Sequence, residues 1–322
     1  MQKTTYTVGL PGTDAEFNSI QDAIDQAVLD GHDADDPANI VVSPGTYVED
    51  VAMAAGISVF GTAQATLDGT VTVDLLDQGS LERTTCTWRQ VTIAPTGAGV
   101  IGVSFTGTVA QQGRFIETII DPADGDAFVA DNTGVEGPDP SFLAIVQCTS
   151  EIVTPGRVSV RQSAGLVFLT LSQLNNLPDE VCIDSSGGLV FSLRNSFTGR
   201  LLLSAGAVAL LRRVRVAAAG ASAIDIDAAS TVLAEGDTVV DTDTGPSISG
   251  SGVLFRDFIT ETGSGMGIDP ALTELFIPVN GAPNLSYAAT PADWIGAPPA
   301  NQQDFNDRVA SLLVTLNAGP IP

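Results

Sequence analysis

The residues of this sequence that are best suited to chemistry are arginines and aspartates in its second half. Three arginines lie about 20 residues after a fourth arginine, and two aspartates follow them. The set is Arg194, Arg212, Arg213, Arg215, Asp225 and Asp227. A polysaccharide lyase needs a strong base, usually arginine or lysine, beside carboxylates that calcium neutralises. The alternative is that these charges face solvent at alternate strand positions and pair across neighbouring coils.

Aspartates of the same region are also weak candidates for calcium ligands. They are Asp225, Asp227, Asp241 and Asp243, with Asp237 between them. Calcium prefers carboxylate oxygens, and adjacent coils of a repeat could bring several carboxylates together. The alternative is a solvated acidic face that binds no metal. We expect no cofactor.

The residue types exclude several other functions. The 322 residues include one histidine, His32, and one lysine, Lys3, so the clustered acids, histidine and lysine of a polygalacturonase are missing. There are 38 acidic and 13 basic residues, and the formal net charge of −25 disfavours nucleic acid and anionic membranes as partners. The sequence shows neither a secretory signal nor an apolar run long enough to cross a membrane.

The cysteines predict a reducing compartment. Cys86, Cys148 and Cys182 are widely spaced and odd in number, and none belongs to a CxxC pair. We expect small, buried apolar residues here, and neither a disulfide framework nor a zinc site.

Short apolar runs recur through the middle of the chain and predict a solenoid. Runs such as Leu166-Val167-Phe168 begin at residues 166, 189, 208, 232 and 253, a period of roughly 20 residues. Second short runs follow several of them, at 181–183, 201–203 and 224–226. A coil of this length with two or three short strands predicts an all-β, single-stranded, right-handed parallel β-helix. Each coil can bury its apolar face only against its neighbours.

A helical pattern near the start predicts a cap on the first coil. The apolar residues that follow the helical period are Phe17, Ile20, Ile24, Ala27 and Val28. Asn18 or Ser19 can cap this helix, and Gly31 can end it. The helix would cover strand edges that are otherwise unpaired. We therefore expect a strand, the cap helix and the first coil in residues 1–50, and the solenoid in 51–277.

The remaining residues, 278–322, predict a proline-rich arm and a C-terminal helix over 302–317. Its apolar positions form a heptad seam: Phe305, Val309, Leu312 and Leu316. Because two heptads are too short for a stable lone helix, this segment needs a partner. The partner is either the chain's own β-helix or further copies of the chain.

The opening of the chain resembles the pectin-lyase-like superfamily. The residues concerned are 17–24, Phe-Asn-Ser-Ile-Gln-Asp-Ala-Ile, and 40–49, Ile-Val-Val-Ser-Pro-Gly-Thr-Tyr-Val-Glu. They are similar to the cap helix and first coil of pectin methylesterases, polysaccharide lyases and phage tailspikes. The resemblance implies the fold but not one activity. Against a pectin methylesterase, Asp257-Phe258-Ile259 matches its nucleophile segment only in part, and Thr260-Glu261 follows.

The end of the chain resembles the closing segment of phage structural proteins. The similar residues are 292–299, Ala-Asp-Trp-Ile-Gly-Ala-Pro-Pro, and 304–309, Asp-Phe-Asn-Asp-Arg-Val. The resemblance implies a virion protein that is often trimeric. We expect Trp294, Pro298 and Pro299 to fix the arm to a neighbouring subunit.

Together these observations predict a non-enzymatic virion structural protein: a capsid decoration, spike or fibre subunit that acts as a rigid module. Its expected partners are two further copies of itself in a homotrimer, other virion proteins and a host surface glycan. It would assemble in the host cytoplasm. The alternative is a polysaccharide-active β-helix enzyme, such as a lyase or a tailspike depolymerase. A third hypothesis is a cell-surface adhesin, which the lack of a visible export signal disfavours.

Overall fold

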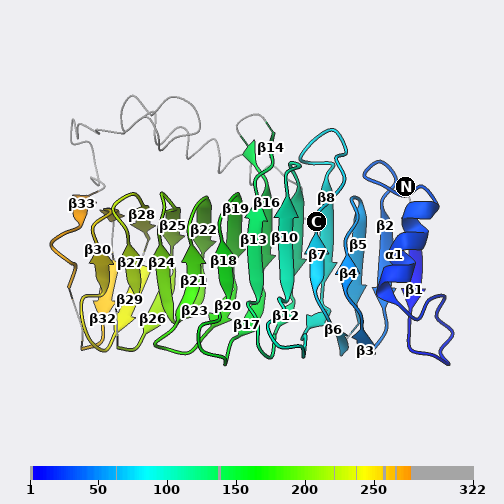
Figure 1. Ribbon diagram of the computed structural model, residues 1–322, viewed down its shortest axis with the longest axis horizontal. Coiled ribbons are helices and arrows are strands. Elements are labelled where there is room, and N and C mark those ends of the chain that lie inside the picture. Colours follow the sequence, from blue (N-terminus) through cyan, green and yellow to red (C-terminus); the bar gives the residue numbers. More distant parts are fainter. Residues whose placement is uncertain are drawn as a thin grey trace. The chain divides into compact units, whose positions relative to one another are not determined.

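The protein folds as a right-handed parallel β-helix, as the repeat predicts. The computed structural model describes residues 3–276 except positions 63, 137–138, 221, 237, 257–258 and 265–266. Within the compact unit Met1–Phe276, three long parallel sheets of 12, 10 and 9 strands run along the solenoid (Figure 1). Each coil passes in turn through sheet A, sheet B and sheet C.

Sheet A contains the apolar runs from which the repeat was read. Its strands are β1 (Thr4–Val8), β2 (Ala38–Val42), β5 (Ile57–Gly61), β8 (Thr85–Arg89), β11 (Gln112–Ile116), β16 (Phe142–Val146), β19 (Leu166–Thr170), β22 (Leu189–Leu193), β25 (Val208–Arg212), β28 (Thr231–Glu235), β31 (Val253–Arg256) and β33 (Thr273–Phe276). Val167, Val190 and Ala209 are partners in register and are fully buried. Such stacks of small apolar side chains form the core of the solenoid.

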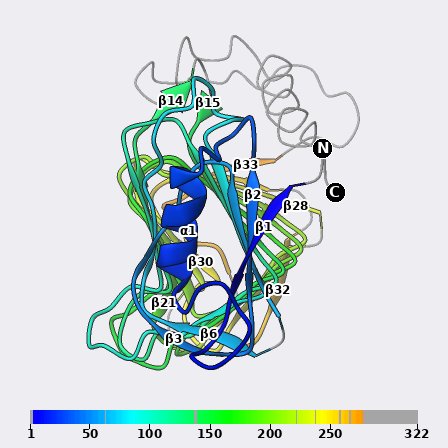
Figure 2. The ribbon, with the colours of Figure 1, turned by 90° about the vertical axis from the view of Figure 1, so that its right-hand side faces the viewer.

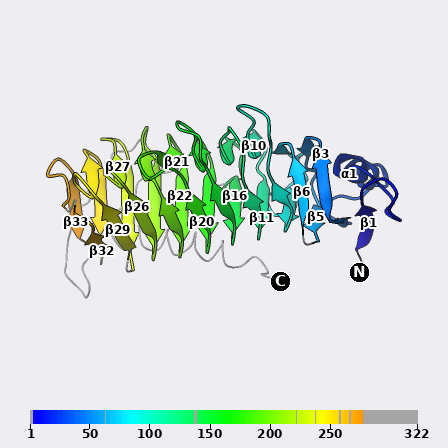
Figure 3. The ribbon, with the colours of Figure 1, turned by 90° about the horizontal axis from the view of Figure 1, so that it is seen from below.

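Sheet B has shorter strands and lies beside sheet A along the solenoid (Figure 3). Its strands are β3 (Gly45–Val48), β6 (Ala65–Asp68), β9 (Thr92–Ile93), β12 (Ile119–Ile120), β17 (Thr149–Glu151), β20 (Gln173–Asn175), β23 (Ser196–Thr198), β26 (Arg215–Ala218), β29 (Thr238–Thr242) and β32 (Ile259–Thr262). A single residue with positive φ begins the turn from sheet A in many coils, for example Arg194 at 56° and Arg213 at 55°.

A buried polar ladder holds this turn together. The backbone N–H of Ser172 donates to Asn195 Oδ1 at 2.7 Å, and the N–H of Cys148 donates to Ser172 Oγ at 3.1 Å. Buried backbone groups must find partners, and a turn too tight for strand pairing leaves them without any. The inward side chains of the next coil supply these partners, so the ladder ties the coils to one another.

Sheet C closes each coil. Three of its strands contain the second apolar runs seen in the sequence, at 181–183, 201–203 and 224–226. The strands of sheet C are β4 (Val51–Ala52), β7 (Val71–Val73), β10 (Val103–Gly107), β13 (Phe128–Asn132), β18 (Val160–Gln162), β21 (Val181–Ser185), β24 (Arg200–Leu203), β27 (Ile224–Ile226) and β30 (Ile248–Gly250). A small antiparallel pair, β14 (Val135–Glu136) and β15 (Asp139–Pro140), extends the connection from β13 to β16.

The cap helix, α1 (Ile20–Leu29), lies across the open N-terminal end of the solenoid (Figure 2). Ser19 is its N-cap and accepts a hydrogen bond from the Asp22 N–H. Its buried face consists of Ile20, Ala23, Ile24 and Ala27, whereas Val28, placed on that face by the sequence pattern, is 48% exposed. Ala23, which the sequence pattern did not place on this face, is fully buried.

The cysteines are buried and free, as expected. Burial raises the pKa of each thiol to about 12. Residues 277–322 lie outside the described part of the chain, and with them the predicted helix 302–317 and the attachment residues Trp294, Pro298, Pro299, Phe305, Val309, Leu312 and Leu316. The division into three regions therefore stays a prediction. Among the described residues, no helix is both long and apolar enough to cross a membrane.

Candidate functional site

Long connections are concentrated at the two edges of sheet C in the first half of the solenoid. Residues 94–102, 121–127 and 152–159 connect sheet B to sheet C in three successive coils, whereas the later coils make the same connection with five residues or, between β23 and β24, with Gly199 alone. At the other edge, residues 74–84 connect β7 to β8. Binding and catalytic residues often lie on or beside loops that a rigid scaffold positions. The outward face of sheet C between these loops is therefore the first place to search.

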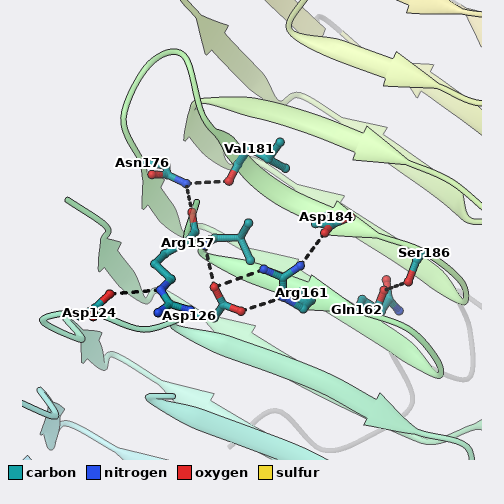
Figure 4. A network of polar contacts seen from close by, with 10 residues as sticks. Asp124, Asp126, Arg157, Arg161, Gln162, Asn176, Val181, Asp184 and Ser186 are labelled. Carbon is teal, nitrogen blue, oxygen red and sulfur yellow. Dashed lines mark hydrogen bonds and ion pairs between the residues drawn. The ribbon is translucent and has the colours of Figure 1, made fainter. Parts of the chain in front are cut away.

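An arginine between two aspartates stands on this face (Figure 4). Arg161 lies on β18, and its strand partner in the next coil is Asp184 on β21. The Arg161 guanidinium donates from Nε to Asp126 Oδ2 at 2.8 Å and from Nη1 to Asp184 Oδ2 at 2.7 Å. Asp126 comes from the loop before β13, so three successive coils supply the three side chains. We call Asp126, Arg161 and Asp184 the sheet C triad.

The members of the triad differ in how much solvent reaches them. The Asp126 side chain is 10% exposed and also accepts a hydrogen bond from the Val158 N–H at 2.9 Å. The side chains of Asp184 and Arg161 are 24% and 41% exposed. The Asp126 carboxylate raises the pKa of Arg161, chiefly through their hydrogen bond. Asp126 thus anchors the arginine, while Asp184 and the outer edge of the guanidinium can meet a substrate.

Neighbouring polar contacts fix the loop before the triad (Figure 4). Arg157 Nε donates to Asp124 Oδ1 at 3.2 Å, which joins two of the loops at the edge of sheet C. Asn176 Nδ2 donates to the carbonyls of Arg157 and Val181, at 2.7 and 2.6 Å. These contacts tie each loop to the next coil, so the site is built on ordered backbone.

The arginines singled out in the sequence gather elsewhere, at the edge where sheet A turns into sheet B. We call Arg194, Arg212, Arg213 and Arg215 the arginine edge. Arg194, Arg213 and Arg215 line a surface hollow of about 390 Å³. Arg215 pairs with Asp241 on the next coil at 3.0 Å, as the alternative of charges paired across coils predicts. The other three side chains form no hydrogen bond or ion pair with a described residue.

The aspartates predicted beside these arginines lie on a different sheet. Asp225 is on β27 in sheet C, where it pairs with Arg200 at 3.2 Å. Asp227, in the following turn, accepts hydrogen bonds from the backbone of Ala205 and Ala229. The lyase arrangement read from the sequence is therefore wrong in its geometry. Residues close in sequence turn onto separate faces of the solenoid.

The calcium candidates are divided in the same way. Asp225 and Asp227 belong to sheet C, whereas Asp241 is on β29 in sheet B with Asp243 just after it. Hydrogen bonds to the Asp227 carboxylate outweigh the effect of its burial, and its pKa is lowered. No group of three potential metal ligands converges within the residues that the structure describes, among which Asp237 is not included.

Comparison with known proteins assigns the chain to no family. No protein-family model matches the chain, and no curated protein matches it. A solved pectin methylesterase from Aspergillus niger is 14% identical, covering 88% of this chain and 93% of that one, with a TM-score of 0.39. The pectin methylesterase PemA from Erwinia chrysanthemi is 11% identical, covering 85% and 94%, with a TM-score of 0.30. The A-module of a mannuronan C-5 epimerase from Azotobacter vinelandii is 12% identical, covering 80% and 94%, with a TM-score of 0.29.

The solved proteins named above are enzymes, so they give no support to the prediction that the chain is not an enzyme, and that prediction is withdrawn. The TM-scores are all below 0.5, so the fold is established by the chain's own three sheets, and any chemistry has to be argued from its own residues. The virion role, the homotrimer and the host glycan remain predictions. The partial match to an esterase nucleophile segment falls at Asp257 and Phe258, outside the described residues.

The three residues of the sheet C triad give no joint signal in the sequence. Asp126, Arg161 and Asp184 are separated by more than one repeat, and each looks like an ordinary outward charge. The register of the coils would have revealed Arg161 beside Asp184, but Asp126 comes from an irregular loop that carries no repeat signal.

Proposed function

We propose that this protein is a hydrolase that cleaves ester groups on a polysaccharide, with the sheet C triad as its active site. The observation that carries the proposal is the placement of two aspartates on either side of one partly exposed arginine, between the long loops of sheet C. A regular strand face would need only pairwise charges, as at Arg200 and Asp225 further along the same sheet.

The proposed reaction uses Asp184 as the base. Its carboxylate takes a proton from water, and the oxygen of that water attacks the ester carbonyl carbon. Arg161 stabilises the negative charge that develops on the carbonyl oxygen, as a fixed cation does in other hydrolytic sites. The carbon–oxygen bond to the alcohol then breaks, and the alcohol takes the proton back from Asp184. The products are a carboxylic acid and an alcohol, and Asp184 is regenerated.

Ester cleavage fits these groups better than cleavage between sugars. Glycosidases commonly need a protonated carboxyl group beside the leaving oxygen. Both carboxylates of the triad accept hydrogen bonds from a guanidinium, so neither is arranged as a proton donor. A carbonyl carbon needs instead a base and a stabiliser for the oxyanion, which Asp184 and Arg161 supply.

The test is turnover on a panel of methyl-esterified and acetylated polysaccharides, followed as acid release in a pH-stat. Asp184→Asn should lower kcat by at least about 100-fold, the usual contribution of a positioned base. Arg161→Lys should also lower kcat, because an ammonium cannot reproduce the paired geometry of a guanidinium. The matched control is Asp225→Asn, which alters an arginine–aspartate pair two coils away on the same sheet and should leave kcat unchanged.

Two results would contradict the proposal. One is release of acid by Asp184→Asn at the rate of the unaltered protein. The other is cleavage between sugar units, seen as new reducing ends, with no loss of ester groups.

A further inference from the structure

The arginine edge has a charge balance unlike that of the rest of the chain. Of the seven other arginines that the structure describes, those at 83, 89, 157, 161, 200 and 256 each form an ion pair with an aspartate or glutamate, and Arg114 hydrogen-bonds the Gln112 side chain at 2.9 Å. At the edge, Arg215 pairs with Asp241, and the other three arginines form no ion pair with a described residue, although Glu235 is the strand partner of Arg212. Acidic residues outnumber basic ones by 38 to 13. A group of unpaired cations in so acidic a chain is an arrangement that a bound anion would stabilise.

The turn geometry sets these arginines side by side. Arg194 and Arg213 both have positive φ and occupy the same place in successive coils, directly after β22 and β25. Adjacent parallel strands lie about 4.8 Å apart, so the two backbones bring like charges close together. Like charges on neighbouring coils repel one another. An anion bound between the two guanidinium groups would offset that repulsion.

The hollow at the arginine edge is also lined by uncharged side chains that could contact a ligand. Besides three arginines it is lined by Gln173 and Ser196, which are exposed, and by Val239 of the next coil. Guanidinium groups bind carboxylate and sulfate oxygens in a forked geometry. Amide and hydroxyl side chains can hydrogen-bond the hydroxyls of a sugar. The hollow extends across successive coils, so an extended ligand would lie along the solenoid axis.

We infer that the arginine edge is a binding site for an acidic polysaccharide, separate from the sheet C triad. That the ligand is a polysaccharide rests on the proposed function. The location of the site and its preference for a negatively charged ligand are argued from the arginine edge itself. Duplex DNA, with one charge per about 1.7 Å of its axis, would be repelled by the remainder of this acidic chain. A polymer with one carboxylate or sulfate per sugar has a much lower charge density and needs only the local arginines.

Binding can be measured by isothermal titration calorimetry at low salt, with four probes: a polyuronate, a sulfated polysaccharide, a neutral polysaccharide of similar length and inorganic sulfate. The test variant is Arg194→Gln/Arg213→Gln. Its control, Lys3→Gln/Arg83→Gln, removes the same charge at exposed positions away from the edge. Glutamine keeps a long side chain at each positive-φ position, and circular dichroism spectra should show that both proteins stay folded.

The unaltered protein and the control should bind at least one acidic polymer and not the neutral one. The test variant should bind that polymer about 10-fold or more weakly, the loss of two charge-assisted contacts at an accessible surface. A preference for the polyuronate or for the sulfated polymer would identify the anionic group that the site binds. Binding of inorganic sulfate but of neither polymer would show a site for single anions and would overturn the inference. Equal binding by the test variant and its control would also overturn it.

The two proposals can fail separately. Asp184→Asn should retain the affinity measured here, and Arg194→Gln/Arg213→Gln should retain kcat on a short, soluble ester. If Arg194→Gln/Arg213→Gln loses polymer binding and the unaltered protein cleaves no ester, the binding site at the arginine edge is supported and the active site at the sheet C triad is rejected.

Discussion

Replacing Glu49 with alanine should loosen the cap helix from the first coil of the solenoid. The Glu49 carboxylate, in the turn after β3, accepts three hydrogen bonds from the N-terminus of α1. The donors are Ser19 Oγ at 2.6 Å, the Ile20 N–H at 2.8 Å and the Gln21 N–H at 3.0 Å. The first N–H groups of a helix have no partner within the helix, and their positive end favours a negative charge. One side chain therefore satisfies the helix and fixes it to the coil.

The expected loss can be estimated from these contacts. At about 1 kcal/mol net for each hydrogen bond, three bonds give about 3 kcal/mol. Glu49 is half-buried, so water replaces part of what is lost, and about 2 kcal/mol is the expected change in the free energy of local opening. Glu49→Gln keeps an oxygen acceptor and should cost about 1 kcal/mol. Because each coil of a solenoid contacts only its neighbours, the effect should stay near the N-terminal end.

Native-state hydrogen exchange measured by mass spectrometry tests this directly. Amides of α1, β1 and β2 should exchange about 30-fold faster in Glu49→Ala, since each 1.4 kcal/mol is a factor of ten. Asp14→Asn, which alters an exposed carboxylate of the loop before the helix, is the control and should change nothing. Equal protection of α1 in Glu49→Ala and in the control would refute the assigned role, and so would faster exchange spread evenly over all coils.

Three further predictions concern the core and its titrating groups. Phe128→Ala, which removes a fully buried ring in edge contact with Phe115, should lower the free energy of unfolding by about 3–5 kcal/mol in urea denaturation, and a loss below 1 kcal/mol would contradict the packing. The three cysteines, with pKa values of about 12, should not react with a thiol reagent at pH 8 until denaturant is added. Burial and the hydrogen bond to Asp30 raise the pKa of Tyr6 to about 12, so its contribution to stability is present below pH 10 and is lost as the pH rises towards 12. Tyr6→Phe should remove a late phase from the ultraviolet titration of tyrosinate, and an unchanged titration would contradict this assignment.

The sequence predicts the solenoid because its signal is repeated. The runs beginning at 166, 189, 208, 232 and 253 fall in sheet A, and those at 181, 201 and 224 fall in sheet C. Most strands of sheet B give no such signal, because a segment such as Gln173-Leu174-Asn175 has one apolar residue between two polar ones. The turn before it depends on positive φ at Leu171, and a glycine would have marked that turn more clearly.

The functional residues were harder to find for a geometric reason. In a coil of three sheets, residues a few positions apart point to different faces, and residues a full coil apart become neighbours. Arg212 and Asp225 lie close together along the chain, yet they belong to sheets A and C. Arg161 and Asp184, more than 20 positions apart, are strand partners. Assigning strands to sheets before searching for clusters would have recovered that pair.

The most direct test of the proposed active site is hydrogen exchange of the Asp184→Asn variant, which should turn over slowly, with and without an ester-carrying polysaccharide that the unaltered protein cleaves. We predict slower exchange in β13, β18 and β21 and in the loops 121–127 and 152–159, where the sheet C triad lies. Protection limited to other coils, with these segments exchanging as in the free protein, would contradict it.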